Sequence, residues 1–200
     1  MKFVINKKKL EINESLLIII IASIFSKNIY SYFKLYFLCY FFIIIHESLH
    51  LIVAKKFTKQ IHGIRFGICG VNAEIDNVKD PFLLFIIKLA GPISNLILAF
   101  IFRNNALIFS INMILFFINM LPIYPLDGYD ILKSILKLIL LNKNIIHSIV
   151  IYTNFYALFA VWIVSIIFFE KFDNISLLIF TICVTLLNMR ERKKNEFVEK

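Results

Sequence analysis

The feature that most constrains this chain is a series of apolar runs, each close to the length that crosses a lipid bilayer. A spanning helix needs about 20 mostly apolar residues. Six such runs are found, at residues 14–30, 32–54, 81–102, 105–124, 146–169 and 174–189. Hydrophobic residues make up 60% of the chain, against about 45–50% in soluble domains. The sequence therefore predicts an all-α integral membrane protein with about six transmembrane helices.

The first run follows a basic segment, "MKFVINKKKLEINES". The apolar residues after this segment lack a convincing small-residue cleavage site, so we expect a retained span rather than a signal peptide. No Gly/Ser-rich linker and no repeat divides the chain, and 200 residues suit one compact membrane domain. We therefore expect residues 1–200 to form a single domain.

The positions of the Lys and Arg residues predict the orientation in the membrane. Seventeen of the 22 flank the apolar runs on one side, three flank them on the other, and two lie within runs. Because cytoplasmic loops carry the excess of positive charge, both termini are expected in the cytoplasm. A basic, apolar chain places its lysines against anionic lipid, so we expect the lipid bilayer, and no nucleic acid, as a partner.

Residues 60–78, "QIHGIRFGICGVNAEIDNV", differ from the rest of the chain. Ile64, Phe66 and Ile68 alternate with Arg, Gly and Cys, and the alternation resumes after Gly70. A period of two broken by glycines is typical of short strands. We expect a small β-hairpin here, between spans two and three, on the cytoplasmic side.

Two histidines and a glutamate lie inside the apolar stretch "IIIHESLHLIV", residues 43–53. A charged side chain at the bilayer centre costs roughly 2.5–3.5 kcal/mol on insertion scales, so such residues usually serve a function. On a helix, His46 and His50 share one face and can reach one zinc ion. Glu47 stands beside the first ligand, where it can accept a proton from a water molecule at the ion. The alternative is a helix end whose polar side chains reach the cytoplasmic interface.

A catalytic zinc site needs three protein ligands, and the stretch "NMLPIYPLDGYDIL", residues 119–132, offers the third. Pro122 and Pro125 end the helix of span four, and Gly128 allows a tight turn. Asp127 is then a carboxylate at a broken helix near membrane depth, which suits a zinc ligand. Its alternative role is the N-cap of the amphipathic helix that follows.

The stretch "AGPISNL", residues 90–96, lies in the middle of span three. Gly91 and Pro92 are expected to interrupt the helix, and irregular backbone at this depth requires protein or a water-filled cavity beside it. Asn95 would then project an amide that hydrogen-bonds a reacting carbonyl oxygen. Alternatively, Gly91 and Ser94 form a helix–helix contact.

Five other polar residues carry weaker signals. His62 and His147 are interpreted as solvated or interfacial histidines, and Asp130 as charge in the first turn of a helix. Asn119 and Asn154, both within spans, are interpreted as bridges between helices. We leave all five outside the predicted zinc site.

HESLH, GPISN and LDG, in this order and on successive spans, resemble the motifs of the site-2 protease family of intramembrane metalloproteases. "NMLPIYPLDG" and the compact six-span layout are most similar to the branch of stage IV sporulation protein FB. The resemblance covers residues 10–190. It implies zinc as the cofactor, with His46, His50 and Asp127 as its ligands.

By the same resemblance, Glu47 is the catalytic base, and Asn95 helps to position substrate or to stabilise the oxyanion. The family cleaves membrane-tethered precursors of transcription regulators, in regulated intramembrane proteolysis, and the sporulation branch releases a pro-sigma factor in the mother cell. We therefore expect an endopeptidase that acts on a membrane-tethered protein substrate. Membrane inhibitor proteins and further copies of the chain, as a homo-oligomer, are candidate partners.

Three features depart from the family pattern. Leu49 stands where Gly or Ala is common, and Tyr129 and Asp130 follow LDG where Gly-Arg is common. Neither departure removes a ligand. The nucleotide-sensing CBS domain that often follows the membrane domain of the sporulation protease is not expected here, nor is regulation by ATP through it.

Two other functions fit part of the sequence. A metal transporter also needs polar ligands within its spans, but along a pathway through the bilayer, whereas here they cluster near the cytoplasmic face. A non-catalytic scaffold would bind membrane partners through the same fold, and the presence of Glu47 argues against it.

Overall fold

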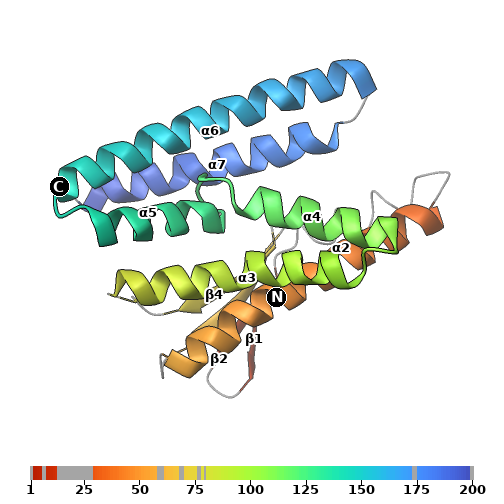
Figure 1. The fold of residues 1–200 in the computed structure, drawn as a ribbon, viewed down its shortest axis with the longest axis horizontal. Helices are drawn as coiled ribbons and strands as arrows, with labels where there is room; N and C mark the ends of the chain where they lie inside the picture. The colour runs from red at the N-terminus through yellow and green to blue at the C-terminus, as the bar shows by residue number, and fades with distance from the viewer. Residues whose placement is uncertain are drawn as a thin grey trace. The chain divides into compact units, whose positions relative to one another are not determined.

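The computed structural model describes residues 2–5, 8–12, 29–57, 61–67, 70–75, 78, 80–172 and 175–198. The chain divides into two compact units, Met1–Phe117 and Ile118–Lys200, and each is described by itself (Figure 1). The predicted first span, residues 14–30, lies outside the described residues except for its last two positions.

The first unit is built around two long helices, α2 (Ile29–Phe57) and α3 (Pro81–Ile101), which pack against each other (Figure 1). Long apolar runs favour helices in lipid, because a helix bonds its backbone groups internally. α3 begins at a clear capping signal. The Asp80 side chain accepts a hydrogen bond of 2.9 Å from the Phe82 N–H, and proline opens the helix.

The first unit also contains a four-stranded sheet in the order β1 (Lys2–Ile5), β2 (Lys8–Ile12), β3 (Ile61–Gly67) and β4 (Gly70–Ile75). β1 pairs antiparallel with β2, and β3 pairs antiparallel with β4. β2 and β3 are parallel. Parallel strands need a long crossover between them, and the stretch of chain that contains α2 supplies it. α2 packs against β3 and β4.

The sheet corrects the predicted fold class. An all-α fold is wrong: the antiparallel pair β3–β4 lies where the hairpin was predicted, but it belongs to a mixed four-stranded sheet. The other half of this sheet comes from the N-terminal segment, which we had interpreted by its positive charge alone. Its period of two is weak but present, since Phe3 and Ile5 lie two residues apart, as do Leu10 and Ile12.

α4 (Ala106–Asn119) runs from the first unit into the second. The second unit then consists of α5 (Asp127–Ile139), α6 (Lys143–Phe172) and α7 (Ser176–Val198). α6 and α7 pack side by side, and α5 packs against α6 (Figure 1).

Buried polar side chains join α6 to α7. The hydroxyl groups of Ser165 and Thr181 lie 2.6 Å apart, and Trp162 Nε1 donates to Thr185 Oγ1 at 3.1 Å. Apolar burial gives little net attraction between helices in lipid, so such hydrogen bonds and close packing hold helix pairs together.

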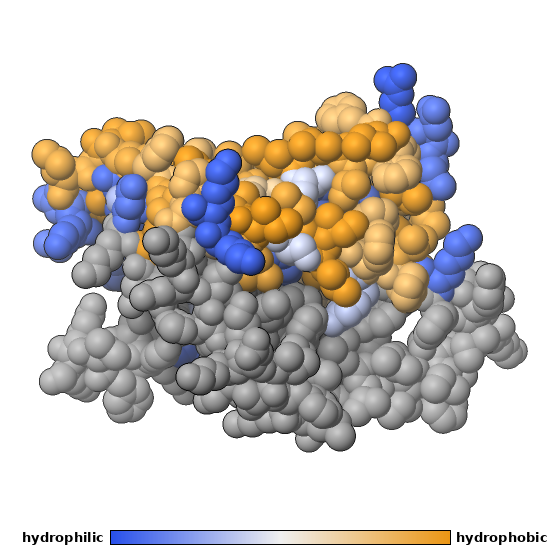
Figure 2. All heavy atoms as spheres, turned by 90° about the horizontal axis from the view of Figure 1, so that it is seen from below, coloured by the Kyte–Doolittle hydropathy of each residue, from blue (hydrophilic) through white to orange (hydrophobic). Residues whose placement is uncertain are grey.

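Among the described residues, three helical stretches are long and apolar enough to cross a membrane: Phe37–Phe57 of α2, Pro81–Ile101 and Lys143–Phe172. α4 and the apolar stretch Ser176–Arg190 of α7 are shorter. The prediction of about six transmembrane helices is therefore wrong in number for the part that the structure describes. Figure 2 shows a face of the molecule on which the residues that the structure describes are mostly apolar. Exposed apolar surface of this extent marks contact with a membrane or a partner.

Candidate metal centre

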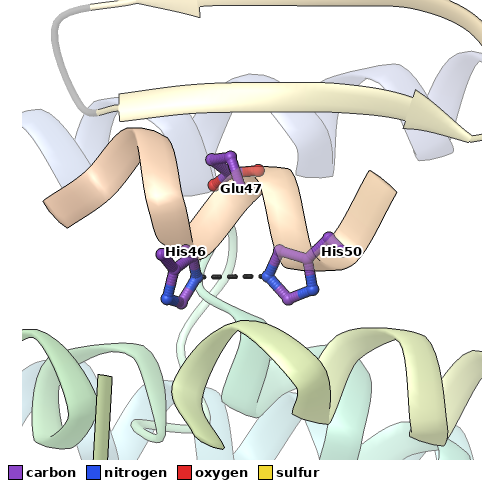
Figure 3. Close-up of side chains that lie close together, drawn as sticks. All are labelled: His46, Glu47 and His50. Carbon is purple, nitrogen blue, oxygen red and sulfur yellow. Dashed lines mark hydrogen bonds between the residues drawn. The ribbon is translucent and has the colours of Figure 1, made fainter. Parts of the chain in front are cut away.

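His46 and His50 project from the same side of α2, one helical turn apart (Figure 3). Each is only 3% exposed, and their Nε2 atoms lie 3.1 Å apart. Two zinc–nitrogen bonds of about 2.0–2.1 Å at a tetrahedral angle would place the two nitrogens about 3.3–3.4 Å apart. The pair therefore already has nearly the separation that one ion requires.

The ring of His50 is oriented by α3. Its Nδ1 lies 2.6 Å from the carbonyl oxygen of Ile87, and because a carbonyl can only accept, Nδ1 carries the hydrogen. Neutral His50 then has its lone pair on Nε2, the atom that faces His46. A histidine whose second nitrogen donates to a backbone carbonyl is the usual arrangement of a metal ligand.

Asn95 of α3 contacts the other histidine. It is fully buried, and its Nδ2 lies 3.0 Å from Nδ1 of His46. The Oδ1 atom of Asn95 is buried and has no hydrogen-bond partner among the residues that the structure describes. Burying a polar atom without a partner costs about 1–3 kcal/mol, so this oxygen needs an explanation.

The two orientations of the Asn95 amide correspond to two states of the histidine pair. With Nδ2 toward the ring, His46 accepts at Nδ1 and carries its hydrogen on Nε2, which donates to His50. If the amide is rotated by 180°, Oδ1 accepts from the Nδ1–H of His46. The Nε2 lone pairs of His46 and His50 then both point to the same position. The two ends of an amide have nearly the same size. The donor set therefore fits a metal ion in the rotated orientation of the amide.

Gly91 provides the space beside the two rings. A Cβ atom at this position would come within 2.6 Å of the Nε2 atoms of both His46 and His50. Any side chain here would displace the imidazoles. The predicted helix–helix contact at Gly91 is thus a contact between the backbone of α3 and the two imidazoles of α2.

α3 continues through Gly91 and Pro92 without a break, so the predicted interruption of this helix is wrong. Pro92 lacks an N–H and removes one helical hydrogen bond, but the helical turn is kept, and the Ser94 hydroxyl donates to the Gly91 carbonyl at 2.6 Å. The unbroken helix places Ile87, Gly91 and Asn95 on one face at intervals of four residues. All three contact the histidine pair, or would do so through a Cβ atom.

Glu47 follows His46 on α2 and is partly exposed. Its carboxylate and the ring nitrogens of His46 and His50 offer ligand atoms that all lie within 4.8 Å of one another. Figure 3 shows the Glu47 side chain on a different side of α2 from the two rings. Among the described residues, these three form the one cluster of His, Cys, Asp or Glu side chains that could bind a metal ion.

Asp127 belongs to the second unit, where it is the first residue of α5 and is 7% exposed. Leu126 occupies the N-cap position, and no side chain makes a capping hydrogen bond there. The alternative role of Asp127 as an N-cap is therefore not observed. A carboxylate in the first turn is stabilised by the helix dipole.

The loop before α5 is compact. The Leu126 N–H donates to the Ile123 carbonyl at 2.7 Å, and the Ile123 N–H donates to the Leu121 carbonyl at 2.8 Å. A Cβ atom on Gly128 would come within 2.5 Å of the carbonyl groups of Met120 and Leu121. Only glycine therefore allows α5 to begin so close to the end of α4.

Two of the weaker candidates of the sequence lie where they were expected. His147 is exposed on α6, and Asp130 lies in the first turn of α5. The side chain of His62 lies outside the described part. Sequence reasoning missed Ile87, whose functional atom is a backbone carbonyl, and no side-chain motif points to such an atom.

The fold is similar to that of a solved structure, "Site-2 Protease from Methanocaldococcus jannaschii". The TM-score is 0.71 at 22% sequence identity, and the match covers 96% of this chain and 94% of that chain. No protein-family model and no curated protein matches the sequence. The chain is thus a membrane protein with the fold of a site-2 protease.

Proposed function

We propose that the protein is an intramembrane zinc metalloprotease that hydrolyses a peptide bond in or near the membrane segment of a tethered protein. The observation that carries the proposal is the pair of Nε2 atoms of His46 and His50, 3.1 Å apart beside Gly91. A simple packing contact would not need a residue without a side chain at that point. The site-2 protease fold supports the same conclusion.

Three residues are proposed to bind the zinc ion. His46 and His50 would bind through Nε2, since each Nδ1 lies against a group of α3. Asp127 is proposed as the third ligand from the order of the sequence motifs. Zinc, when bound, lowers the pKa of a water ligand to about 7 and polarises carbonyl groups.

The residues around the ligands take distinct roles in this proposal. Glu47 accepts a proton as general base, because its carboxylate lies within 4.8 Å of the histidine nitrogens. Asn95 acts through His46 as a positioning residue, since its amide selects which ring nitrogen carries the hydrogen. The expected contact of Asn95 with an oxyanion stays a prediction.

The proposed substrate is a membrane-tethered precursor of a transcription regulator, and the motif resemblance suggests a pro-sigma factor in sporulation. A spanning helix keeps its carbonyl groups in internal hydrogen bonds, so the substrate must unwind locally before cleavage. β4 is an edge strand of the sheet. An edge strand can bind an extended peptide by strand addition, and this supports a role of β4 in substrate binding.

The function is tested by expressing the full chain together with a panel of membrane-tethered precursors. Glu47→Gln keeps the shape of the side chain but cannot accept the proton, so cleavage should fall by about 10²- to 10⁴-fold while zinc content is unchanged. Glu170→Gln, which changes an exposed carboxylate of α6, should cleave like the wild type. A zinc-loaded Glu47→Gln variant with wild-type cleavage would refute the mechanism.

The same experiment separates the protease from its alternatives. If the wild-type chain cleaves no precursor in a broad panel, the non-catalytic scaffold becomes the better explanation. A metal transporter needs ligands along a pathway through the bilayer. The described residues offer one group of potential metal ligands, at His46, Glu47 and His50, which does not favour transport.

We also propose that both termini face the cytoplasm, because of the bias in the positions of Lys and Arg residues. A reporter fused after Lys200 should then be cytoplasmic, and one inserted near Arg103 should be translocated. A translocated C-terminal reporter would reverse the assignment.

A further inference from the structure

Two buried asparagines bridge α6 and α7. Asn154 and Asn188 are each 4% exposed. The Nδ2 atom of Asn154 donates to Oδ1 of Asn188 at 3.2 Å, and the Nδ2 atom of Asn188 donates to Oδ1 of Asn154 at 2.9 Å. The bridging role expected of Asn154 is therefore observed, and its partner is a residue that the sequence analysis did not single out.

The same two side chains bind the backbone of Tyr124 in the loop before α5. The Tyr124 N–H donates to Oδ1 of Asn154 at 3.0 Å, and Nδ2 of Asn188 donates to the Tyr124 carbonyl at 3.2 Å. Both backbone polar groups of one loop residue are thus satisfied by side chains from α6 and α7. Tyr124 lies three residues before Asp127.

A role in joining helices alone does not account for this arrangement. α6 and α7 are already joined by the contacts of Ser165 with Thr181 and of Trp162 with Thr185. Those groups bond their own helices or each other, whereas the asparagines also bind a loop. Backbone polar groups outside a helix need such partners at membrane depth, because lipid offers none.

The loop connects the anchored Tyr124 to the start of α5 over a short distance in the sequence. From Tyr124 the chain reaches α5 through Pro125 and Leu126, and Leu126 makes two backbone hydrogen bonds, to Ile123 at 2.7 Å and from Tyr129 at 3.2 Å. The Tyr124 and Tyr129 rings also meet edge to face, with centroids 5.7 Å apart. The position of the first residue of α5 therefore depends on where Tyr124 is held.

We propose that Asn154 and Asn188 are positioning residues that fix the Tyr124 backbone and, through it, the Asp127 carboxylate. The inference rests on the proposed role of Asp127 as a zinc ligand. It assigns to α6 and α7 a task beyond packing against each other, namely to hold the loop that precedes the proposed ligand.

The first test measures the zinc affinity of the purified full chain by competition with a chromogenic chelator. Groups that support a metal ligand typically contribute 10- to 100-fold in affinity, so Asn154→Leu and Asn188→Leu should each weaken zinc binding by about 10-fold or more. Ser165→Ala and Thr181→Val are matched controls, because they remove a buried polar contact between the same two helices. Both controls should bind zinc within about twofold of wild type, a range below any effect of ligand support.

A double-mutant cycle with Asp127→Ala locates the effect. If the asparagines act through Asp127, Asn188→Leu should weaken zinc binding in the wild type but not in the Asp127→Ala background. Equal losses in both backgrounds would overturn the inference. If Asp127→Ala alone leaves zinc affinity unchanged, the ligand assignment of the proposed function fails and the inference fails with it. If Asp127→Ala weakens binding and the asparagine variants do not, only the inference fails.

A second measurement needs no variant and remains decisive if the leucine variants do not fold. In the wild-type chain, the Tyr124 amide should exchange slowly with deuterium, because its N–H donates to Oδ1 of the buried Asn154 at 3.0 Å. Mass spectrometry of the peptides that cover the loop resolves this amide. Exchange of the Tyr124 amide at the rate of an unprotected peptide would overturn the inference.

Discussion

On α2, the helix itself brings His46 and His50 together, and α3 orients each ring through one contact, from the Ile87 carbonyl and from Asn95. Before α5, the backbone is irregular, and the position of Asp127 depends on a loop that side chains of other helices hold. The first region needs a gap in which two rings can meet. The loop before α5 needs hydrogen-bond partners for backbone groups that are not part of a helix.

This difference teaches which changes each region should tolerate. In the histidine region, added volume at Gly91 meets the ends of two side chains that can rotate. In the loop region, added volume at Gly128 meets backbone carbonyls that cannot move alone. We therefore expect the histidine region to lose metal binding without losing its fold, and the loop region to lose both together.

The largest expected effect would break the histidine region outright. The wild-type chain should bind about one zinc ion, as a site of three ligands implies, and the double variant His46→Ala/His50→Ala should bind none. Elemental analysis of the purified chain measures this content. His147→Ala, at an exposed histidine of α6, is the control and should keep its zinc. Unchanged zinc in the double variant would remove α2 from the metal site.

The next effect sharpens the comparison between the two glycines. Gly91→Ala should weaken zinc binding by about 100-fold, the upper end for groups beside a metal ligand, and should leave the melting temperature close to that of the wild type. Gly128→Ala should lower both the zinc affinity and the melting temperature. Chelator competition and thermal unfolding in detergent measure the two quantities. If Gly91→Ala unfolds the chain as readily as Gly128→Ala, the distinction between the regions is wrong.

The smallest effect concerns how the His46 ring is oriented. Asn95→Leu should weaken zinc binding by about 10-fold, because Nδ1 of His46 loses its partner. Asn95→Asp should restore most of the affinity, since a carboxylate accepts from the Nδ1–H in either orientation.

Asn112→Leu is the matched control for Asn95→Leu. It also removes a fully buried amide whose Oδ1 has no partner among the described residues, but whose Nδ2 donates within its own helix, to the Ile108 carbonyl at 3.0 Å. Equal losses of affinity in Asn95→Leu and Asn112→Leu would show that buried amides matter only for the fold.

The side chains of the histidine region could be predicted from the sequence, because the geometry of a helix converts a spacing of four into a shared face. His46 and His50 were recognised in this way, whereas Asn95 was singled out for an expected break of the helix at Gly91 and Pro92, which the structure does not show. Ile87 could not be recognised, because any residue supplies a carbonyl. Asn188 was missed because its partner Tyr124 is 64 residues away in the sequence, and an isolated asparagine in an apolar run has no pattern that reveals a distant contact.

The strands show a different limit. Residues 61–75 alternate clearly enough to predict extended structure, whereas residues 2–12 contain lysines that suggested only a cytoplasmic segment. Pairing between β2 and β3 joins segments about 50 residues apart. No local pattern specifies such a partner, so the sheet could not be predicted even where a strand could.

The parallel pairing of β2 with β3 has a consequence for how the chain is threaded through the bilayer. Two strands that share hydrogen bonds lie on the same side of the membrane, so the chain between Ile12 and Ile61 must cross an even number of times. α2 is long and apolar enough to cross the membrane once, so an odd number of crossings in this interval would place β2 and β3 on opposite sides and break their pairing. The pairing of β2 with β3 therefore restricts the number of membrane crossings between them to an even value.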